Sequence, residues 1–137
     1  MQTRDRTLTK RTMFVTDVGF LCYWLLTAGG AISVGVDPFL HQWNWSFIGL
    51  DLLAIALGLL SVATARRSPE RSRMLMVISL TATAAAGLMA INFYAIRCSF
   101  DPAWWLPNLW LLLFPVIALG RMFTKLDAPQ SPHAVAR

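Results

Sequence analysis

The chain has 137 residues, of which 56% are hydrophobic and only 14% are charged, and its formal net charge at pH 7 is +5. Charged residues make up about a quarter of an ordinary soluble domain, so this composition excludes a soluble globular protein and indicates an integral membrane protein. The basic residues lie between apolar runs and not on one face, which excludes a nucleic-acid-binding protein and indicates a role in membrane orientation.

Residues 1–12 form a basic leader, in which Arg4, Arg6, Lys10 and Arg11 outnumber one acid. The first apolar run follows over residues 13–36 and contains Asp17. A basic leader before an apolar run is also typical of a signal peptide. However, the apolar part of a signal peptide is about 7–15 residues long. The longer run found here, with an acid near its start, favours a membrane span that stays in the protein.

The second span is predicted over residues 45–65, after a connector at 37–44 that begins with Asp-Pro, a pair that disfavours continuing a helix. About twenty apolar residues are enough to cross a bilayer core of about 30 Å. This span carries one acidic residue, Asp51. It ends in a polar turn at 65–73 that contains four arginines.

The third span is predicted over residues 74–96, where Ala82, Ala86 and Ala90 recur at four-residue spacing. Small residues at this spacing let helix backbones approach closely in lipid. The fourth span, residues 104–123, follows a second connector and is expected to be kinked by Pro115. The tail at 124–137 has two prolines and no periodicity, so we expect it to be disordered.

The predicted fold is therefore an all-α integral membrane four-helix bundle. Four spans place both termini on the same side of the membrane. Eleven of the twelve basic residues then fall on that side, and only Arg97 falls on the other. Because basic loops stay inside, we expect the N-terminus and the C-terminus to be cytoplasmic.

Polar residues inside the predicted spans are the candidates for a functional site, because a charge at a helix centre costs about 2.5–3.5 kcal/mol on insertion scales. Three of them, Asp51, Asn92 and Asn108, fall at one depth near the outer boundary, and Arg97 lies just beyond Asn92. This predicted polar cluster either locks the helices together or binds a ligand or a proton. Asp17 lies near the cytoplasmic end of its span, where we expect pairing with nearby basic residues.

Tryptophans mark the outer boundary of the predicted bundle. This predicted outer rim is explained by an interfacial aromatic belt or, alternatively, by the aromatic mouth of a ligand site. Its members are Trp43, Trp45, Trp104, Trp105 and Trp110.

The sequence contains no spacing typical of a metal site and no nucleotide-binding or nucleophile motif. We therefore expect no metal and no cofactor. An intramembrane lipid or isoprenoid enzyme needs a general acid and a general base. Only Asp51 is evident as one of them, which favours a protein without catalytic activity.

Three segments together resemble the YvaD-like family of small four-span bacterial membrane proteins: TDVGFLCYW at 16–24, NWSFIGLDLL at 44–53 and DPAWWLPNLWLLLFP at 101–115. The resemblance covers most of residues 14–120. It implies a multi-pass protein of the bacterial plasma membrane whose function is uncharacterised. Its polar and proline positions correspond here to Asp17, Asn44, Trp45, Asp51, Pro107, Asn108 and Pro115.

Two functions are therefore favoured over an enzyme. The first, and the preferred one, is an accessory or interaction subunit, which uses the polar cluster only to hold the bundle and docks a membrane-protein partner or a second copy on its small-residue face. It is preferred because 137 residues and four spans leave little room for an enclosed translocation path in a monomer. The second is a ligand-binding or transport-type protein with an outer-half site around Asp51. Besides such a partner, we expect contacts with membrane lipids and none with nucleic acid.

Overall fold

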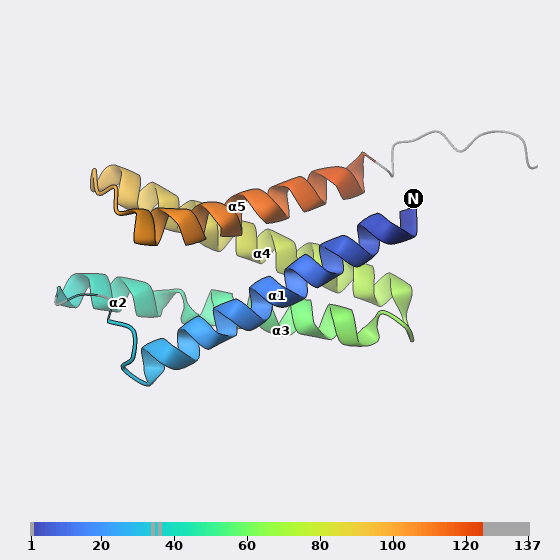
Figure 1. Cartoon of the computed structure of the whole chain (residues 1–137), viewed down its shortest axis with the longest axis horizontal. Coiled ribbons are helices and arrows are strands. Elements are labelled where there is room, and N and C mark those ends of the chain that lie inside the picture. Colours follow the sequence, from blue (N-terminus) through green and yellow to red (C-terminus); the bar gives the residue numbers. More distant parts are fainter. Residues whose placement is uncertain (1, 34, 36, 125–137) are drawn as a thin grey trace, which may run out of the picture.

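The computed structural model of the chain describes residues 2–33, 35 and 37–124, with side chains described from Thr7 onward. The tail predicted to be disordered lies outside the described residues from position 125. The described part contains helices and no strand, so the prediction of an all-α protein is confirmed. Figure 1 shows the helices α1 (Gln2–Ala28), α2 (Pro38–Ser46), α3 (Ile48–Thr64), α4 (Pro69–Ile96) and α5 (Pro102–Phe123).

Helix α1 includes both the basic leader and much of the first apolar run. It ends at Ala28, where Gly30 adopts a left-handed φ of 74° and the Ala31 N–H donates to the Leu26 carbonyl oxygen at 2.8 Å. A glycine in this conformation is a common helix terminator, because it has no Cβ to clash with the backbone. The helix therefore ends eight residues before the end of the predicted span.

Helices α2 and α5 begin in the same way. Asp37 and Asp101 are their N-caps, and each carboxylate accepts a hydrogen bond of 2.9 Å from the backbone N–H two residues later. A proline follows each cap at the first helical position, where it costs no hydrogen bond. The expectation of a connector at 37–44 is thus wrong for most of its residues, because the Asp-Pro pair, taken as a signal against continuing a helix, caps and starts α2.

Three helical stretches of the described chain are long and apolar enough to cross a membrane: Pro38–Thr64, which joins α2 and α3, Pro69–Ile96 and Pro102–Phe123. Helix α1 is not among them, since Arg11 and Asp17 lower its hydropathy. The length and composition of these three stretches therefore indicate a membrane protein.

The helices pack mainly on their neighbours: α1 on α3, α3 on α4, and α4 on α5. Helices α4 and α5 are in very close contact, because a Cβ atom on Gly87 would lie 2.7 Å from the backbone nitrogen of Leu112. Helices α1 and α5 converge at one end, where Met13 and Ala118 belong to a cluster with Met76 and Leu80 of α4. From there they diverge (Figure 1), and the space between them becomes the site described below.

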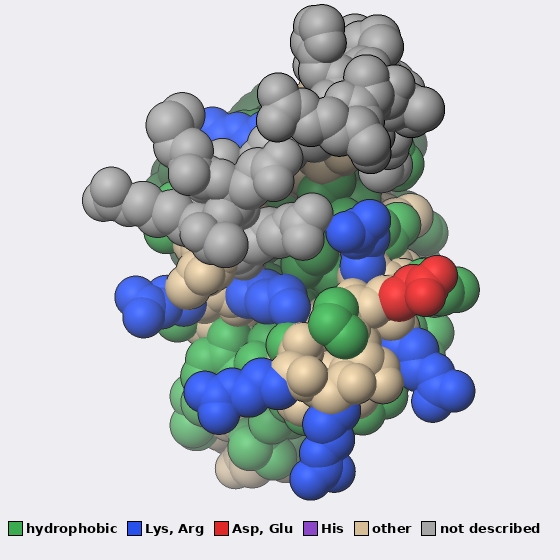
Figure 2. Space-filling model, turned by 90° about the vertical axis from the view of Figure 1, so that its right-hand side faces the viewer, with side chains coloured by type: hydrophobic (Ala, Val, Ile, Leu, Met, Phe, Trp, Pro, Cys, Tyr) green, Lys and Arg blue, Asp and Glu red, His purple; other side chains and the backbone are tan. Residues whose placement is uncertain are grey.

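Basic side chains gather at one end of the molecule. Figure 2 shows this end, where α1 begins and α3 turns into α4, with blue side chains around it and acidic colour at one place. The exposed arginines here are Arg66 and Arg67 of the turn and Arg71 and Arg73 of the first turns of α4. Basic residues that were expected on one side of the predicted bundle therefore also lie together at one end of the structure.

Candidate functional site

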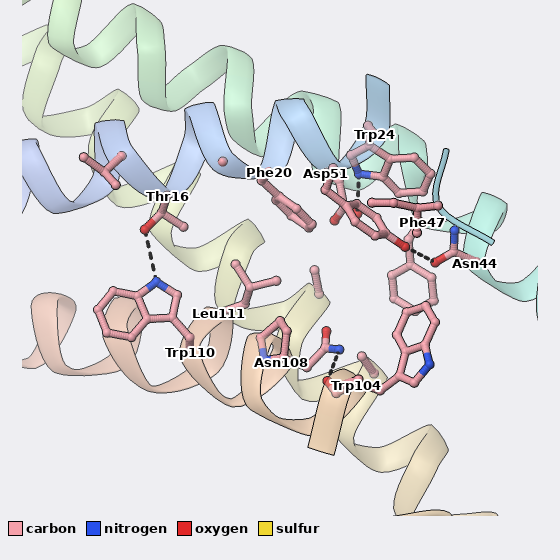
Figure 3. Close-up of a pocket in the computed structure, with 18 of the residues that line it drawn as sticks. Thr16, Phe20, Trp24, Asn44, Phe47, Asp51, Trp104, Asn108, Trp110 and Leu111 are labelled. Carbon is pink, nitrogen blue, oxygen red and sulfur yellow. Dashed lines mark hydrogen bonds between the residues drawn. The ribbon is translucent and has the colours of Figure 1, made fainter. Parts of the chain in front are cut away.

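A cavity of about 1010 Å³, partly open to the outside, lies between α1 and α5, and we call it the α1–α5 groove. One wall is formed by α1 and the other by α5 (Figure 3). Ala86 and Ala90 of α4 line the groove between these walls, and we call them its floor. The groove exists because α1 and α5 diverge and because the floor residues are too small to fill the gap. Its lining is mostly apolar, with a few polar groups at defined places.

Asp51 supplies the acidic group of the groove. It lies near the start of α3, lines the groove and is only 3% exposed. The indole Nε1 of Trp24 on α1 donates a hydrogen bond of 3.1 Å to its Oδ2. Its other oxygen, Oδ1, is buried and accepts no hydrogen bond from the described residues. A buried carboxylate oxygen without a partner is costly, so a hydrogen-bond donor brought beside this atom would stabilise the site.

A second polar pair lies beside Asp51. The hydroxyl of Tyr23 donates a hydrogen bond of 3.0 Å to Oδ1 of Asn44, and both residues line the groove. The amide nitrogen of Asn44 is buried and has no acceptor in the described part of the chain. The rings of Tyr23 and Trp24 meet edge to face with centroids 5.4 Å apart. Together with Asp51, these three residues form what we call the polar end of the groove.

Farther along the groove, a direct contact joins its two walls. Trp110 of α5 donates a hydrogen bond of 3.1 Å from Nε1 to the hydroxyl of Thr16 on α1 (Figure 3). Thr16 precedes Trp24 by eight residues, about 12 Å along the helix. Arg11 lines the groove farther in the same direction. Trp110 therefore lies away from the other tryptophans of the predicted rim.

The remaining four tryptophans of the rim are partly buried and lie near the ends of their helices. Trp43 of α2 stacks on Phe93 of α4 at 3.9 Å, and Trp104 of α5 stacks on Tyr94 of α4 at 5.7 Å. Trp45 packs near Trp24 at 5.6 Å, and Trp105 stacks on Phe100 and donates to the carbonyl oxygen of Ser99. Trp43 and Trp104 also line the groove, so part of this aromatic layer borders it.

The structure brings only part of the predicted polar cluster together. Asp51 and Asn108 both line the groove, although the Asn108 amide donates to the Trp104 carbonyl oxygen of its own helix at 2.7 Å. Asn92 is exposed and does not line the groove. It follows Ala90 of the floor by two residues, and residues two apart on a helix face different ways. The position of Asn92 along its predicted span indicates a depth in the membrane, but it does not indicate the side of the helix on which the side chain lies.

Arg97 lies outside the groove as well. Its guanidinium pairs with the Asp37 carboxylate at 3.9 Å and lies over the rings of Phe39 and Phe93. The pair joins the end of α4 to the start of α2, and both side chains are more than 40% exposed. Arg97 therefore does not neutralise Asp51.

Asp17 is buried in the interface between α1 and α3, away from the groove. It is 3% exposed, and its Oδ2 has no hydrogen-bond partner among the described residues. The carboxylate lies against Gly58 of α3, and the hydroxyl of Ser79 on α4 lies beside the same glycine. Lys10, one of the basic residues near Asp17 in sequence, donates to the hydroxyl of Ser72 at 3.1 Å.

Sequence reasoning missed the partners of Asp51. Neither Tyr23 nor Trp24 was singled out from the sequence as a candidate, and Asn44 stood out only through the family resemblance. One feature of the sequence did point to these residues. The side chains of Tyr23 and Trp24 each carry a hydrogen-bond donor, and such a donor requires an acceptor when it is buried. Asp51 is the one carboxylate among the described lining residues of the groove.

Comparison with known proteins gives a family but no activity. Residues 9–128 match a family of unknown function (DUF5360). The chain is also 36% identical over 113 residues to the "Uncharacterized protein YvaD" of Bacillus subtilis (strain 168), an alignment that covers 78% of this chain and 85% of that protein. No solved structure matches the chain.

Proposed function

The chain belongs to the DUF5360 family, whose function is unknown, and we propose that it is a multi-pass protein of the bacterial plasma membrane that binds a small amphiphilic molecule in the α1–α5 groove. The observation that carries this proposal is the buried, unpartnered Oδ1 of Asp51 at one end of a largely apolar cavity. Apolar cavities with a few placed polar groups are typical of ligand sites.

The proposed topology has four spans, formed by α1, α2 continued by α3, α4, and α5. Helix α1 has 27 residues, about 40 Å at the helical rise, which is enough to cross a bilayer. It exposes large apolar side chains suited to lipid: Phe14, Val15, Val18, Leu25 and Leu26. The basic end in Figure 2 supports cytoplasmic termini, because basic residues stay on that side.

The size of the groove supports a ligand and not a whole partner helix. Ligand cavities commonly measure about 300–1,000 Å³, and the groove is near the upper end of that range at about 1010 Å³. An acyl chain or an aromatic skeleton fits such a space, and the open side of the groove gives it a route from the membrane.

The accessory-subunit hypothesis required a free face of small residues on α4. Ala86, Gly87 and Ala90 are instead buried within the chain, where Gly87 meets the backbone of α5. A partner on this face would have to displace α5. The geometry therefore favours a ligand over a docked helix.

A substitution at Gly19 tests the proposal. Gly19 lines the groove, and a Cβ atom there meets nothing within 4 Å, so Gly19→Phe places a ring in the groove without disturbing the helix. Gly120→Phe is the matched control, because Gly120 of α5 also has open space and does not line the groove. Val15→Trp, at an exposed groove residue, is a second blocking variant.

The measurement is native mass spectrometry of protein purified in lipid nanodiscs. We expect the wild type and Gly120→Phe to retain an amphiphile that both blocking variants lose. Retention of the same molecule by the blocking variants, or its absence from the wild type, contradicts the proposal.

A further inference from the structure

We infer that the polar end of the α1–α5 groove binds a positively charged group, an ammonium carried on an apolar chain or ring system. This inference rests on the proposed function and adds the charge and chemical class of the ligand. The juxtaposition that carries it is an unpaired carboxylate surrounded by aromatic rings inside an apolar cavity.

The charges along the groove give the sign of the ligand. Asp51 and Arg11 are the charged side chains among the described lining residues. Arg11 lies at the far end, about 20 Å from Trp24 along α1 at the helical rise, so it does not pair with Asp51. Arg97, the other nearby candidate, pairs with Asp37. An anionic group at the polar end would therefore meet an uncompensated carboxylate, whereas a cation would neutralise it.

The hydrogen-bonding groups of the polar end leave one acceptor beside the carboxylate. The Trp24 N–H is already used on Asp51 Oδ2, and the Tyr23 O–H is used on Asn44. What remains without a partner among the described residues is one acceptor, Oδ1 of Asp51, and one donor, the amide nitrogen of Asn44. An ammonium group, which carries N–H bonds and a positive charge, suits the carboxylate oxygen.

Aromatic rings complete the environment. Tyr23, Trp24, Phe47 and Trp104 line this part of the groove, as Figure 3 shows for the labelled residues. A cation near aromatic ring faces is attracted by their quadrupoles, and the attraction grows when water is excluded. The apolar walls then accommodate the rest of the molecule, for example along Leu111 and Ala90.

Three probes that share a decyl chain test the charge: decylammonium, decanol and undecanoate. Binding to detergent-purified protein is measured by titration calorimetry, and the signal of Gly19→Phe in the same micelles is subtracted. We expect decylammonium to bind with a Kd about tenfold lower than that of decanol, and undecanoate not to bind. In Asp51→Asn, decylammonium should fall to the level of decanol, which should itself be unchanged.

The outcomes separate the two proposals. Equal binding of all three probes to the wild type, lost in Gly19→Phe, overturns the cationic ligand and leaves the groove as a binding site. Binding that is unaffected by Gly19→Phe overturns both. The comparison of probes on the wild type stands even where Asp51→Asn unfolds.

An ammonium group has two sources in a membrane, a phosphatidylethanolamine headgroup or a free amphiphilic amine. Nanodiscs of mixed phosphatidylethanolamine and phosphatidylglycerol distinguish them by native mass spectrometry. Retained phosphatidylethanolamine, displaced by decylammonium, supports the lipid. Decylammonium binding without retained phosphatidylethanolamine supports the free amine, and selective retention of phosphatidylglycerol overturns the inference.

Discussion

Gly58 of α3 faces the carboxylate of Asp17 across the interface with α1, and the space between them does not admit a Cβ atom. Seven residues earlier on α3, Asp51 meets Trp24, which lies seven residues after Asp17 on α1. The two pairs therefore fix one antiparallel register between α1 and α3. Each pair buries one acidic side chain in this interface, Asp17 from α1 and Asp51 from α3.

The first prediction concerns Gly58→Ala. The added methyl group collides with the Asp17 carboxylate and the Ser79 hydroxyl, so we expect a loss of about 1–3 kcal/mol of stability, typical of overpacking. Gly120→Ala is the control, where open space and better helix propensity predict a gain of up to about 1 kcal/mol. Thermal unfolding in detergent measures both, and equal melting temperatures for the two variants would contradict the close contact.

A second prediction concerns the hydrogen bond between Trp24 and Asp51. Trp24→Phe removes the donor and leaves the carboxylate without its partner, while Asp51→Leu removes the acceptor. Because the two residues stabilise the protein through one shared hydrogen bond, the double variant should lose less stability than the two single variants lose in sum. We expect the difference to be about 0.5–3 kcal/mol. Additive losses in this double-mutant cycle would show that the bond contributes little.

Arg97 serves as the control for the double-mutant cycle of Trp24 and Asp51. Its partner is the exposed Asp37, so Arg97→Gln should cost about 0–1 kcal/mol. Combined with Asp51→Asn, its effect should be additive within about 0.5 kcal/mol. A rescue of Asp51→Asn by Arg97→Gln would instead indicate that the two side chains interact.

Gly87→Ala is the third prediction. The new methyl group would meet the backbone of α5 at 2.7–2.9 Å, and backbone atoms inside a helix do not move aside as a side chain does. We expect a loss of more than about 1 kcal/mol and a weaker α4–α5 contact. Hydrogen exchange of α5 amides measures the second effect. Unchanged exchange together with an unchanged melting temperature would argue against the close approach.

The fourth prediction is the orientation in the membrane. In a background with Cys22→Ser and Cys98→Ser, a cysteine that replaces the exposed Gln42 should react with an impermeant maleimide added to whole cells. A cysteine at Ser68, beside the arginines of the α3–α4 turn, should react only after the cells are opened. Labelling of the Ser68 position from outside would reverse the proposed topology.

The membrane-protein class and the three apolar helices follow from the sequence, because length and hydropathy decide them. The starts of α2 and α5 were also present in the sequence as Asp-Pro pairs, although the first was interpreted as a connector. These features depend on residues that are close together along the chain, which is why sequence reasoning reaches them.

The site depends on contacts between helices, and sequence reasoning reached it only in part. Depth in the membrane grouped Asp51 with Asn92, but depth does not give the rotation of a helix, and Asn92 is turned away. The partner of Asp51 is Trp24, 27 residues earlier. Only the register between α1 and α3 brings these two together, and no local pattern encodes that register.

The burial of Asp17 against Gly58 has a consequence for biogenesis. Helix α1 leaves the ribosome first, but the glycine that accommodates its acid is synthesised about forty residues later. Until α3 is made, Asp17 has no interface in which to be buried, and α1 lacks the hydropathy of the other spans. We therefore expect α1 to enter the bilayer stably only together with α3, so that a nascent chain cut short before Gly58 is a substrate for quality-control proteolysis.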